Sequence, residues 1–382
     1  MIGCTMIGRY LNTIGREQAI MIGMIFIIIQ QGCLAYLATI EDANTFLLVS
    51  FIGQAIGGVG SGINSVSAMA LVVANSPKKD REANIGYVEA FTGIGFLLGP
   101  LFGSFMFTLG GYSLPFLSSL MLYLISYPIV AYNLNKAKIK RLEDEFINFD
   151  PGSPRLTHSD ISILELFSVP RFTFGIMSQS IVTGSVQFLA PSLSLHLQNY
   201  GYTPDFISLC FCIPSILYAS IAPFMYLLTS RMPKRFVIQL GITLMGFGMF
   251  FVGTSKLMGF ENDADFVLAG LCMIGVAAGM IAIPVLPEML ESIEEKEELG
   301  YDPDKMTDVI SSLFVTSTGV GEAIGPIVSS LLIDAYGYTE AQDIYAVFLL
   351  SFAALYLLIT FRQTNKIHEH HPMVELIEDV KF

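Results

Sequence analysis

The stretch Gly93-Ile94-Gly95-Phe96-Leu97-Leu98-Gly99-Pro100 lies in a long apolar segment and leads on to Gly111-Tyr112. The same pattern returns at an offset of 226 residues as Gly319-Val320-Gly321-Glu322-Ala323-Ile324-Gly325-Pro326, followed by Gly337-Tyr338. An internal repeat within apolar segments indicates two related bundles of membrane helices. This architecture is typical of carriers rather than enzymes.

The composition also places the chain in lipid. It has 382 residues, of which 53% are hydrophobic and 14% charged, and its mean hydropathy is +0.61. These charges are too few to cover a soluble globule of this size. Apolar runs of roughly 20 residues can cross a hydrocarbon core as helices. The runs that we expect to do so are 18–40, 45–74, 83–109, 113–134, 170–197, 206–229, 235–255, 265–290, 307–334 and 341–361.

The positions of Lys and Arg predict the orientation. If the first run starts in the cytoplasm, every Lys and Arg except Lys256 falls on the cytoplasmic side. Cytoplasmic loops accumulate these residues, so we expect a multi-pass protein with both termini in the cytoplasm. The pattern fits a vesicle membrane and a plasma membrane alike. The net charge of −13 comes largely from acidic loops and the tail.

The chain divides at a polar stretch, 135–169, which we interpret as a cytoplasmic linker. Four runs precede it and six follow, so the predicted domains are a partial N-terminal bundle (1–134) and a complete C-terminal bundle (170–362), with a cytoplasmic tail (363–382). The loop Ser230–Arg235 before the third run of the second half corresponds to Gly8–Arg16. We therefore expect two helices to have preceded Met1. An incomplete gene model, an internal start and a genuine short form all fit.

Small residues recur every four positions in both copies of the repeat, which places them on one helix face and allows another backbone to approach closely. Each stripe also contains a proline that bends the helix locally. A plain packing surface and a hinge contact during transport are both compatible with this pattern. The residues are Gly95, Gly99, Pro100 and Gly103 in the first copy, and Ser317, Gly321, Gly325, Pro326 and Ser329 in the second.

With these stripes the chain resembles a major facilitator superfamily carrier, whose fifth helix carries a similar glycine-proline motif. Gly8-Arg9-Tyr10-Leu11-Asn12-Thr13-Ile14-Gly15-Arg16 resembles the signature loop between that superfamily's second and third helices. The pattern has an aspartate where Asn12 stands and a basic residue where Thr13 stands. The resemblance implies an all-α membrane fold of two pseudo-symmetric bundles, with about ten of the usual twelve transmembrane helices present.

The segment from Glu89 through Gly99-Pro100 to Gly111-Tyr112-Ser113-Leu114-Pro115-Phe116 is similar to the vesicular amine and polyamine transporter group. That resemblance implies antiport of protons against a small organic cation. In the superfamily the second helix packs against the eleventh. We therefore expect the Ser317/Gly321/Gly325/Ser329 face to lie open to lipid or to another chain.

Two acidic residues inside the runs are the candidates for proton and substrate binding. Glu89 lies about two helical turns into its run and Glu322 about four. An ionised carboxylate at such a depth is unfavourable unless it is protonated, paired or facing water. The alternatives are bonding to loop donors for Glu89 and a local structural hydrogen bond for Glu322. Further polar candidates, each of which could instead make an interhelical hydrogen bond, are Gln54, Gln179, Gln187 and Tyr218.

Glu288, which follows Pro284 and Pro287, is expected to cap or gate the inner end of its helix. The sequence has no phosphate-binding loop, HExxH motif or nucleophile elbow. We therefore predict no enzyme activity, cofactor, resident metal or nucleic-acid partner. The expected partners are lipid, protons and a small-molecule substrate, with uptake of another small solute as an alternative. A non-transporting binding or regulatory partner of a full-length carrier is a further hypothesis.

Overall fold

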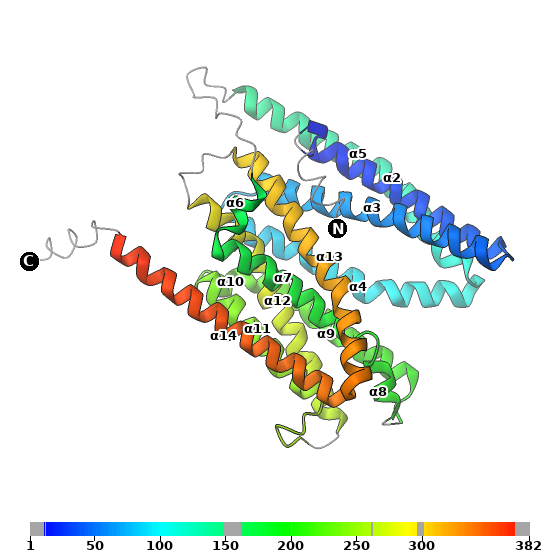
Figure 1. Ribbon diagram of the computed structural model, residues 1–382. Coiled ribbons are helices and arrows are strands. Elements are labelled where there is room, and N and C mark those ends of the chain that lie inside the picture. The colour runs from blue at the N-terminus through cyan, green and yellow to red at the C-terminus, as the bar shows by residue number, and fades with distance from the viewer. Residues whose placement is uncertain are drawn as a thin grey trace, which may run out of the picture. The chain divides into compact units, whose positions relative to one another are not determined.

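The computed structural model describes residues 11, 13–147, 162–199, 201–260, 263–295 and 302–370, and the regular structure in these ranges is helical (Figure 1). Gly8 and Asn12 lie outside the described residues. The first helices are α2 (Arg16–Tyr36), η1 (Leu37–Thr39), α3 (Ala43–Asn75), α4 (Arg81–Gly110) and α5 (Ser113–Ile147). After them come α6 (Ile163–Phe167), α7 (Pro170–Phe188), α8 (Leu193–Asn199), α9 (Pro204–Ile221), η2 (Ala222–Phe224), α10 (Met225–Thr229), α11 (Lys234–Val252), α12 (Ala264–Glu294), α13 (Pro303–Tyr336) and α14 (Tyr338–His370).

Local signals explain several helix ends. Gly111, at φ 69°, follows α4, and Gly337, at φ 90°, separates α13 from α14, so the two copies of the repeat end on the same left-handed glycine. Asp42 caps α3 by accepting hydrogen bonds from the Thr45 amide at 2.8 Å and the Thr45 hydroxyl at 2.6 Å. These bonds stabilise the ionised form and lower the pKa of Asp42.

Among the described residues, eight helices are long and apolar enough to cross a membrane. They account for all the expected runs except 170–197 and 307–334. Those two are helical as well: α7 and α8 occupy the first, and α13 the second. Their windows are more polar, because α7 carries Ser178, Gln179 and Ser180 and α13 carries several acidic residues.

Helix α5 continues to Ile147, beyond the end of its expected run at 134. The extension contains the basic stretch Lys136–Arg141, whose long unbranched side chains favour helix. Part of the segment that the sequence suggested as a linker is therefore helical. The boundaries of the two bundles stay a prediction.

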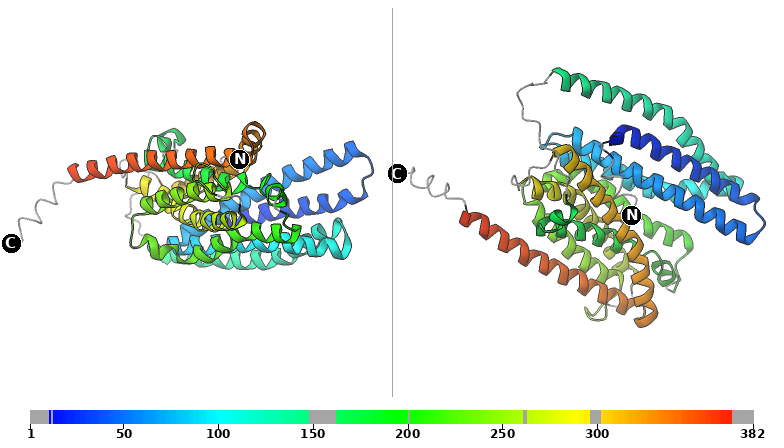
Figure 2. Two further views of the ribbon diagram at one scale, coloured as in Figure 1. Left: turned by 90° about the horizontal axis from the view of Figure 1, so that it is seen from below. Right: turned by 45° about the horizontal axis from the view of Figure 1, so that its top comes forward.

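The chain falls into two compact units, drawn from Met1–Glu165 with Glu294–Val320 (unit 1) and from Leu166–Ile293 with Gly321–Phe382 (unit 2). In unit 1, α2 lies beside α3 and α5 (Figures 1 and 2). The contact with α3 is close because both helices present glycine: a Cβ built on Gly23 would lie 2.8 Å from the Gly60 carbonyl oxygen. A cluster of buried apolar side chains supports this unit, formed by Leu11, Ala19, Val66 and Ala70.

In unit 2, α12 forms the centre, and every residue from Ala277 to Leu290 is buried. Helix α11 packs against it through glycines: Cβ atoms built on Gly241 and Gly248 would lie 2.7 Å and 2.9 Å from side-chain atoms of Ile281 and Ile274. Helix α14 packs against α11 along the length of α11 (Figure 1). Apolar packing around α12 therefore provides the rigid frame that carries the polar groups of this unit.

Candidate functional site

The guanidinium of Arg16, directly after the glycine that precedes α2, binds two acidic residues in the first turns of α13. Its Nε lies 2.6 Å from Asp308 Oδ1, and its Nη2 lies 3.0 Å from Asp304 Oδ1. The same Nη2 donates to the Asp304 carbonyl at 3.1 Å. Arg16 and Asp308 are buried and Asp304 is exposed. A buried charge that is paired in this way holds the start of α2 against α13 within unit 1.

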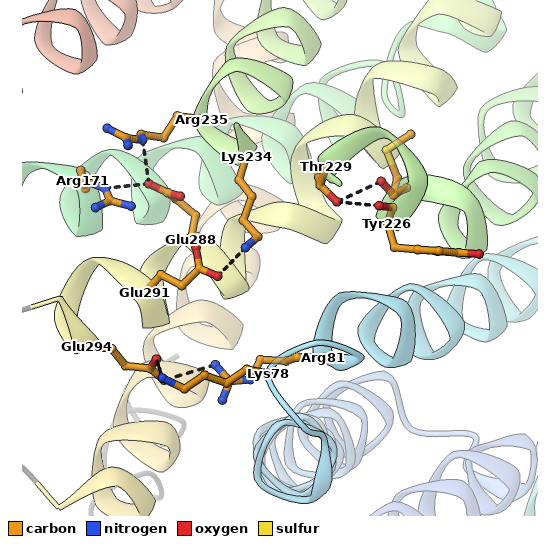
Figure 3. Close-up of polar contacts among 11 residues, drawn as sticks. Lys78, Arg81, Arg171, Tyr226, Thr229, Lys234, Arg235, Glu288, Glu291 and Glu294 are labelled. Atoms are coloured by element: carbon orange, nitrogen blue, oxygen red, sulfur yellow. Dashed lines mark hydrogen bonds and ion pairs between the residues drawn. The ribbon is translucent and has the colours of Figure 1, made fainter. Parts of the chain in front are cut away.

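A second ion-pair cluster closes one end of unit 2 (Figure 3). Glu288 Oε1 accepts from Arg171 Nε at 2.8 Å and lies 3.6 Å from Arg235 Nε. Glu288 is 3% exposed, so water cannot stabilise its negative charge and the two arginines must compensate it. One turn further along α12, Glu291 pairs with Lys234. The cluster joins the first turns of α7 and α11 to α12, and whether Glu288 caps or gates the inner end of α12 stays a prediction.

A third cluster lies in unit 1, where Glu294 binds two cations from the segment before and within α4 (Figure 3). Its Oε2 lies 2.6 Å from Lys78 Nζ, and its Oε1 lies 3.3 Å from Arg81 Nη1. Arg81 is largely buried, whereas Lys78 is exposed. In the second and third clusters, acidic residues in the last turns of α12 face basic residues near a helix start, whereas in the first cluster both the arginine and its acidic partners lie at helix starts.

The glycines of the second repeat copy pack tightly on α7. A Cβ built on Gly321 would lie 2.1 Å from Thr183 Oγ1 and 2.2 Å from the Ser180 carbonyl oxygen, and one on Gly325 would lie 2.4 Å from the Gly184 carbonyl oxygen. Ser317 and Ser329 on the same stripe are 2% and 0% exposed. The expectation that this face is open was therefore wrong. Helix α7 covers the part of this face around Gly321 and Gly325, because neither glycine has a Cβ to keep the α7 backbone away.

The first repeat copy has no such cover within its own unit. Cβ atoms built on Gly95, Gly99 and Gly103 would meet no atom of unit 1 within 4 Å. Pro100 beside them is exposed, and Pro326 at the equivalent place in α13 is half-buried. The stripe predicted from the sequence is thus present on both helices, but it is closely packed on one.

The two candidate carboxylates lie in different units. Glu89, on α4 in unit 1, is half-buried and makes polar interactions. Glu322, on α13 in unit 2, is exposed, although its neighbours Gly321 and Gly325 are buried against α7. Glu322 therefore projects from α13 away from the α7 contact. Whether Glu89 is bonded to loop donors or binds protons stays a prediction.

The remaining polar candidates have different environments. Gln54 accepts a hydrogen bond from Gln30 Nε2 at 2.9 Å, so it forms an interhelical pair between α3 and α2. Gln179 on α7 is 4% exposed, and Gln187 is half-buried near the end of the same helix. Tyr218 on α9 is half-buried, and its ring lies 3.9 Å from a Cβ built on Gly279 of α12. Whether any of these binds substrate stays a prediction.

The acidic partners of Arg16 were missed in the sequence. Asp304 and Asp308 are four residues apart at the start of a helix and therefore share one face, which is a readable signal for a cation partner. In the described part of the chain, no group of three His, Cys, Asp or Glu side chains is placed to hold a metal ion.

These features, a duplicated set of membrane-crossing helices with ion pairs at their ends and glycine stripes along them, define a helical carrier. The family model for the Major Facilitator Superfamily matches residues 1–285 and 175–376, and the chain belongs to this family. Members of this family are transporters and not enzymes, which confirms the prediction that the chain is not an enzyme. The prediction of the family from the stripes is confirmed.

Several characterised proteins are similar to the chain. The MFS-type transporter SLC18B1 of Mus musculus is 25% identical over 351 residues, which span 89% of this chain and 71% of the mouse protein. The vesicular acetylcholine transporter of Drosophila melanogaster is 21% identical, with coverages of 96% and 58%. The chromaffin granule amine transporter of Rattus norvegicus is 22% identical, with coverages of 87% and 58%.

Solved structures share the fold. The fucose:proton symporter FucP of E. coli superposes with a TM-score of 0.67 at 13% identity, covering 93% of this chain and 86% of FucP. The proton:xylose symporter XylE gives a TM-score of 0.68 at 16% identity, with coverages of 94% and 83%. At these identities the likeness shows the major facilitator fold and no more, which confirms the predicted fold class.

Proposed function

We propose that this multi-pass membrane transporter exchanges protons for a small organic cation by alternating access, with the two predicted bundles, 1–134 and 170–362, rocking about a central path. Residues 135–169 would join the bundles, and both termini, including the tail 363–382, would face the cytoplasm. The similarity to proteins named as amine and acetylcholine transporters supports a cationic substrate.

Glu322 is the observation on which this proposal depends. Its carboxylate is exposed on α13, while the glycines on either side of it in the stripe are sealed against α7. An ionised carboxylate is unfavourable in hydrocarbon, so an exposed one within a membrane helix is expected to face water and to bind a proton or a cation. The residue equivalent to Glu322 in the first copy of the repeat is Phe96, so the carboxylate is specific to the second copy.

The ion-pair clusters support alternating access. Arg16 in the first bundle pairs with Asp304 and Asp308 in the second, so these contacts can form in one arrangement of the bundles and break in the other, whereas Glu288 and its two arginines stabilise the second bundle internally. Contacts of this kind give a transporter two discrete arrangements. We propose that the Arg16 contacts stabilise one of the two end states of the cycle.

The test is proton-driven uptake of a labelled amine into proteoliposomes containing the 382-residue chain. Glu322→Gln should reduce uptake at least tenfold, because the variant can neither carry a proton nor attract a cation. Glu322→Asp should restore part of the rate. Asp334→Asn, which changes another exposed acid on α13, is the matched control and should retain uptake. Unchanged uptake by Glu322→Gln would remove this residue from the mechanism.

A second candidate function, a binding partner of a full-length carrier, is favoured by the uncovered Gly95/Gly99/Gly103 face of α4 in unit 1. A smooth face of small residues is where another membrane helix can approach closely. Wild-type proteoliposomes that take up neither amines, polyamines nor other small solutes, while the purified chain associates with a full-length carrier, would select this alternative.

A further inference from the structure

The turn that follows α11 has an unusual backbone. Thr254 adopts φ 46° and is the one residue other than glycine with a positive φ among those that the structure describes. A β-branched residue is disfavoured in this region. Thr254 and the next residue, Ser255, are both fully buried. The turn therefore brings the polar side chain of Ser255 into the interior of unit 2.

Gln342, in the second turn of α14, lies against this turn. A Cβ built on Gly253 would lie 2.5 Å from Gln342 Cβ, so only glycine leaves room for the side chain. Gln342 is 0% exposed, and neither its Oε1 nor its Nε2 has a hydrogen-bond partner. A buried amide with both polar atoms unsatisfied is strongly disfavoured and calls for an occupant that contacts it.

Asp343, the next residue on α14, brings a charge to the same turn. It is 6% exposed, and Ser255 is the polar neighbour that acts on its carboxylate. Nevertheless Asp343 Oδ1 and Ser255 Oγ make no hydrogen bond of normal geometry. The turn after α11 and the start of α14 thus share three unsatisfied oxygen atoms and one amide nitrogen, all buried.

The nearby charges leave the carboxylate of Asp343 undercompensated. Lys256 and Glu340 also face it. Lys256, however, is 72% exposed and pairs with Glu340 at 3.5 Å, so its ammonium group is turned toward water and a second acid. A buried carboxylate that lacks a close cation is unfavourable unless something else neutralises it.

We propose that this cluster is a binding site for one small monovalent cation of the sodium class, held by Gln342 Oε1, the Asp343 carboxylate and Ser255 Oγ. Hard cations prefer oxygen ligands of this kind. A single carboxylate with two neutral oxygens matches one positive charge. A water molecule would satisfy the amide but would bring no positive charge to Asp343, which would then have to bind a proton to become neutral. The bound ion would tie the end of α11 to the start of α14, and this role does not depend on the proposed function.

The test is binding of radioactive Na⁺ to the purified full chain in detergent, with choline as the inert replacement. About one ion per chain should bind at saturation, and Na⁺ should raise the melting temperature by about 2–4 °C over choline. Gln342→Ala and Asp343→Asn should each abolish Na⁺ binding and the shift. Glu340→Gln, a neighbouring exposed acid on α14, is the matched control and should retain both.

Amide hydrogen exchange keeps the test informative if a variant is poorly folded. In the wild-type chain, Na⁺ should slow exchange at 253–260 relative to choline and leave α4 unchanged. Wild-type protein that binds no Na⁺, or that shows the same exchange in both salts, would overturn the proposal, and so would undiminished binding by Asp343→Asn.

Discussion

The two copies of the glycine-proline stripe have a similar local sequence and different surroundings. On α13 the stripe is pressed against α7, with Gly321 and Gly325 in contact with the backbone around Gly184. On α4 the equivalent glycines, Gly95 and Gly99, meet nothing within 4 Å in their unit. Both copies sit in unbroken helices that end on a left-handed glycine. The stripe segment can therefore be helical without a neighbouring helix packed on it. It becomes a tight interface only where a neighbouring helix offers a small residue.

The covering helix is itself held by charge. Arg171, in the first turn of α7, binds Glu288 of α12, so the ion pair at the end of unit 2 fixes the helix that seals the stripe. The contact of the stripe with α7 near Gly184 therefore depends on the ion pair between Arg171 and Glu288 at the start of the same helix. The following substitutions test this comparison, beginning with the largest expected effect.

Glu288→Ala should make the second copy behave like the first. It leaves Arg171 and Arg235, which are 10% and 19% exposed, without their shared partner, and breaking a buried pair of this kind costs about 3–5 kcal/mol. Thermal unfolding in detergent measures the loss. In a background without native cysteines, Ser329→Cys should gain reactivity toward a thiol reagent when Glu288 is replaced, because α7 no longer seals the stripe.

Glu291→Ala is the matched control on the same helix. Glu291 is 42% exposed and pairs with Lys234, so its removal should cost less than about 1 kcal/mol. Equal destabilisation by the two variants would show that the Glu288 cluster has no special hold on α7.

Gly325→Ala and Gly99→Ala compare equivalent positions directly. A methyl group on Gly325 would overlap the Gly184 carbonyl, a backbone atom that cannot move away cheaply, so overpacking should cost about 1–3 kcal/mol. On Gly99 the methyl group meets open space, and helix propensity should make the change neutral or stabilising by up to about 1 kcal/mol. Chemical or thermal unfolding of both variants decides. A loss of similar size in Gly99→Ala would mean that the first stripe is covered after all.

Gly184→Ala should have the smallest effect and sharpens the comparison from the other side of the interface. A Cβ at Gly184 would lie 3.4 Å from the Gly321 carbonyl oxygen and 3.7 Å from the Tyr345 hydroxyl, which are ordinary contacts. The folded protein should therefore tolerate it with a change of less than about 1 kcal/mol, whereas Gly321→Ala should not. If both alanines destabilise equally, the contact is closer than its geometry indicates.

The helices and the family were predictable from local features. Apolar runs, the spacing of Gly95, Gly99 and Gly103, and the repeated Gly-Pro pair all depend on residues close together in the chain. The far end of α5 was harder to place, because polar residues such as those of 136–141 favour a linker by composition and a helix by propensity. The packing of the second stripe was predicted wrongly, since the covering helix lies well over a hundred residues away in the sequence.

The sequence by itself determined that this protein has duplicated membrane-crossing helices, because hydropathy and a repeat of small residues are properties of the chain, and the resemblance of its motifs added the major facilitator family. Only the tertiary structure decided which stripe is sealed, which acids meet Arg16, and that the Gln342 amide and the Ser255 hydroxyl are buried without a hydrogen-bond partner. Such facts depend on the side chain that arrives from a distant helix. Burial and pairing are therefore set by packing, whereas the capacity to form a helix or to enter lipid is set locally.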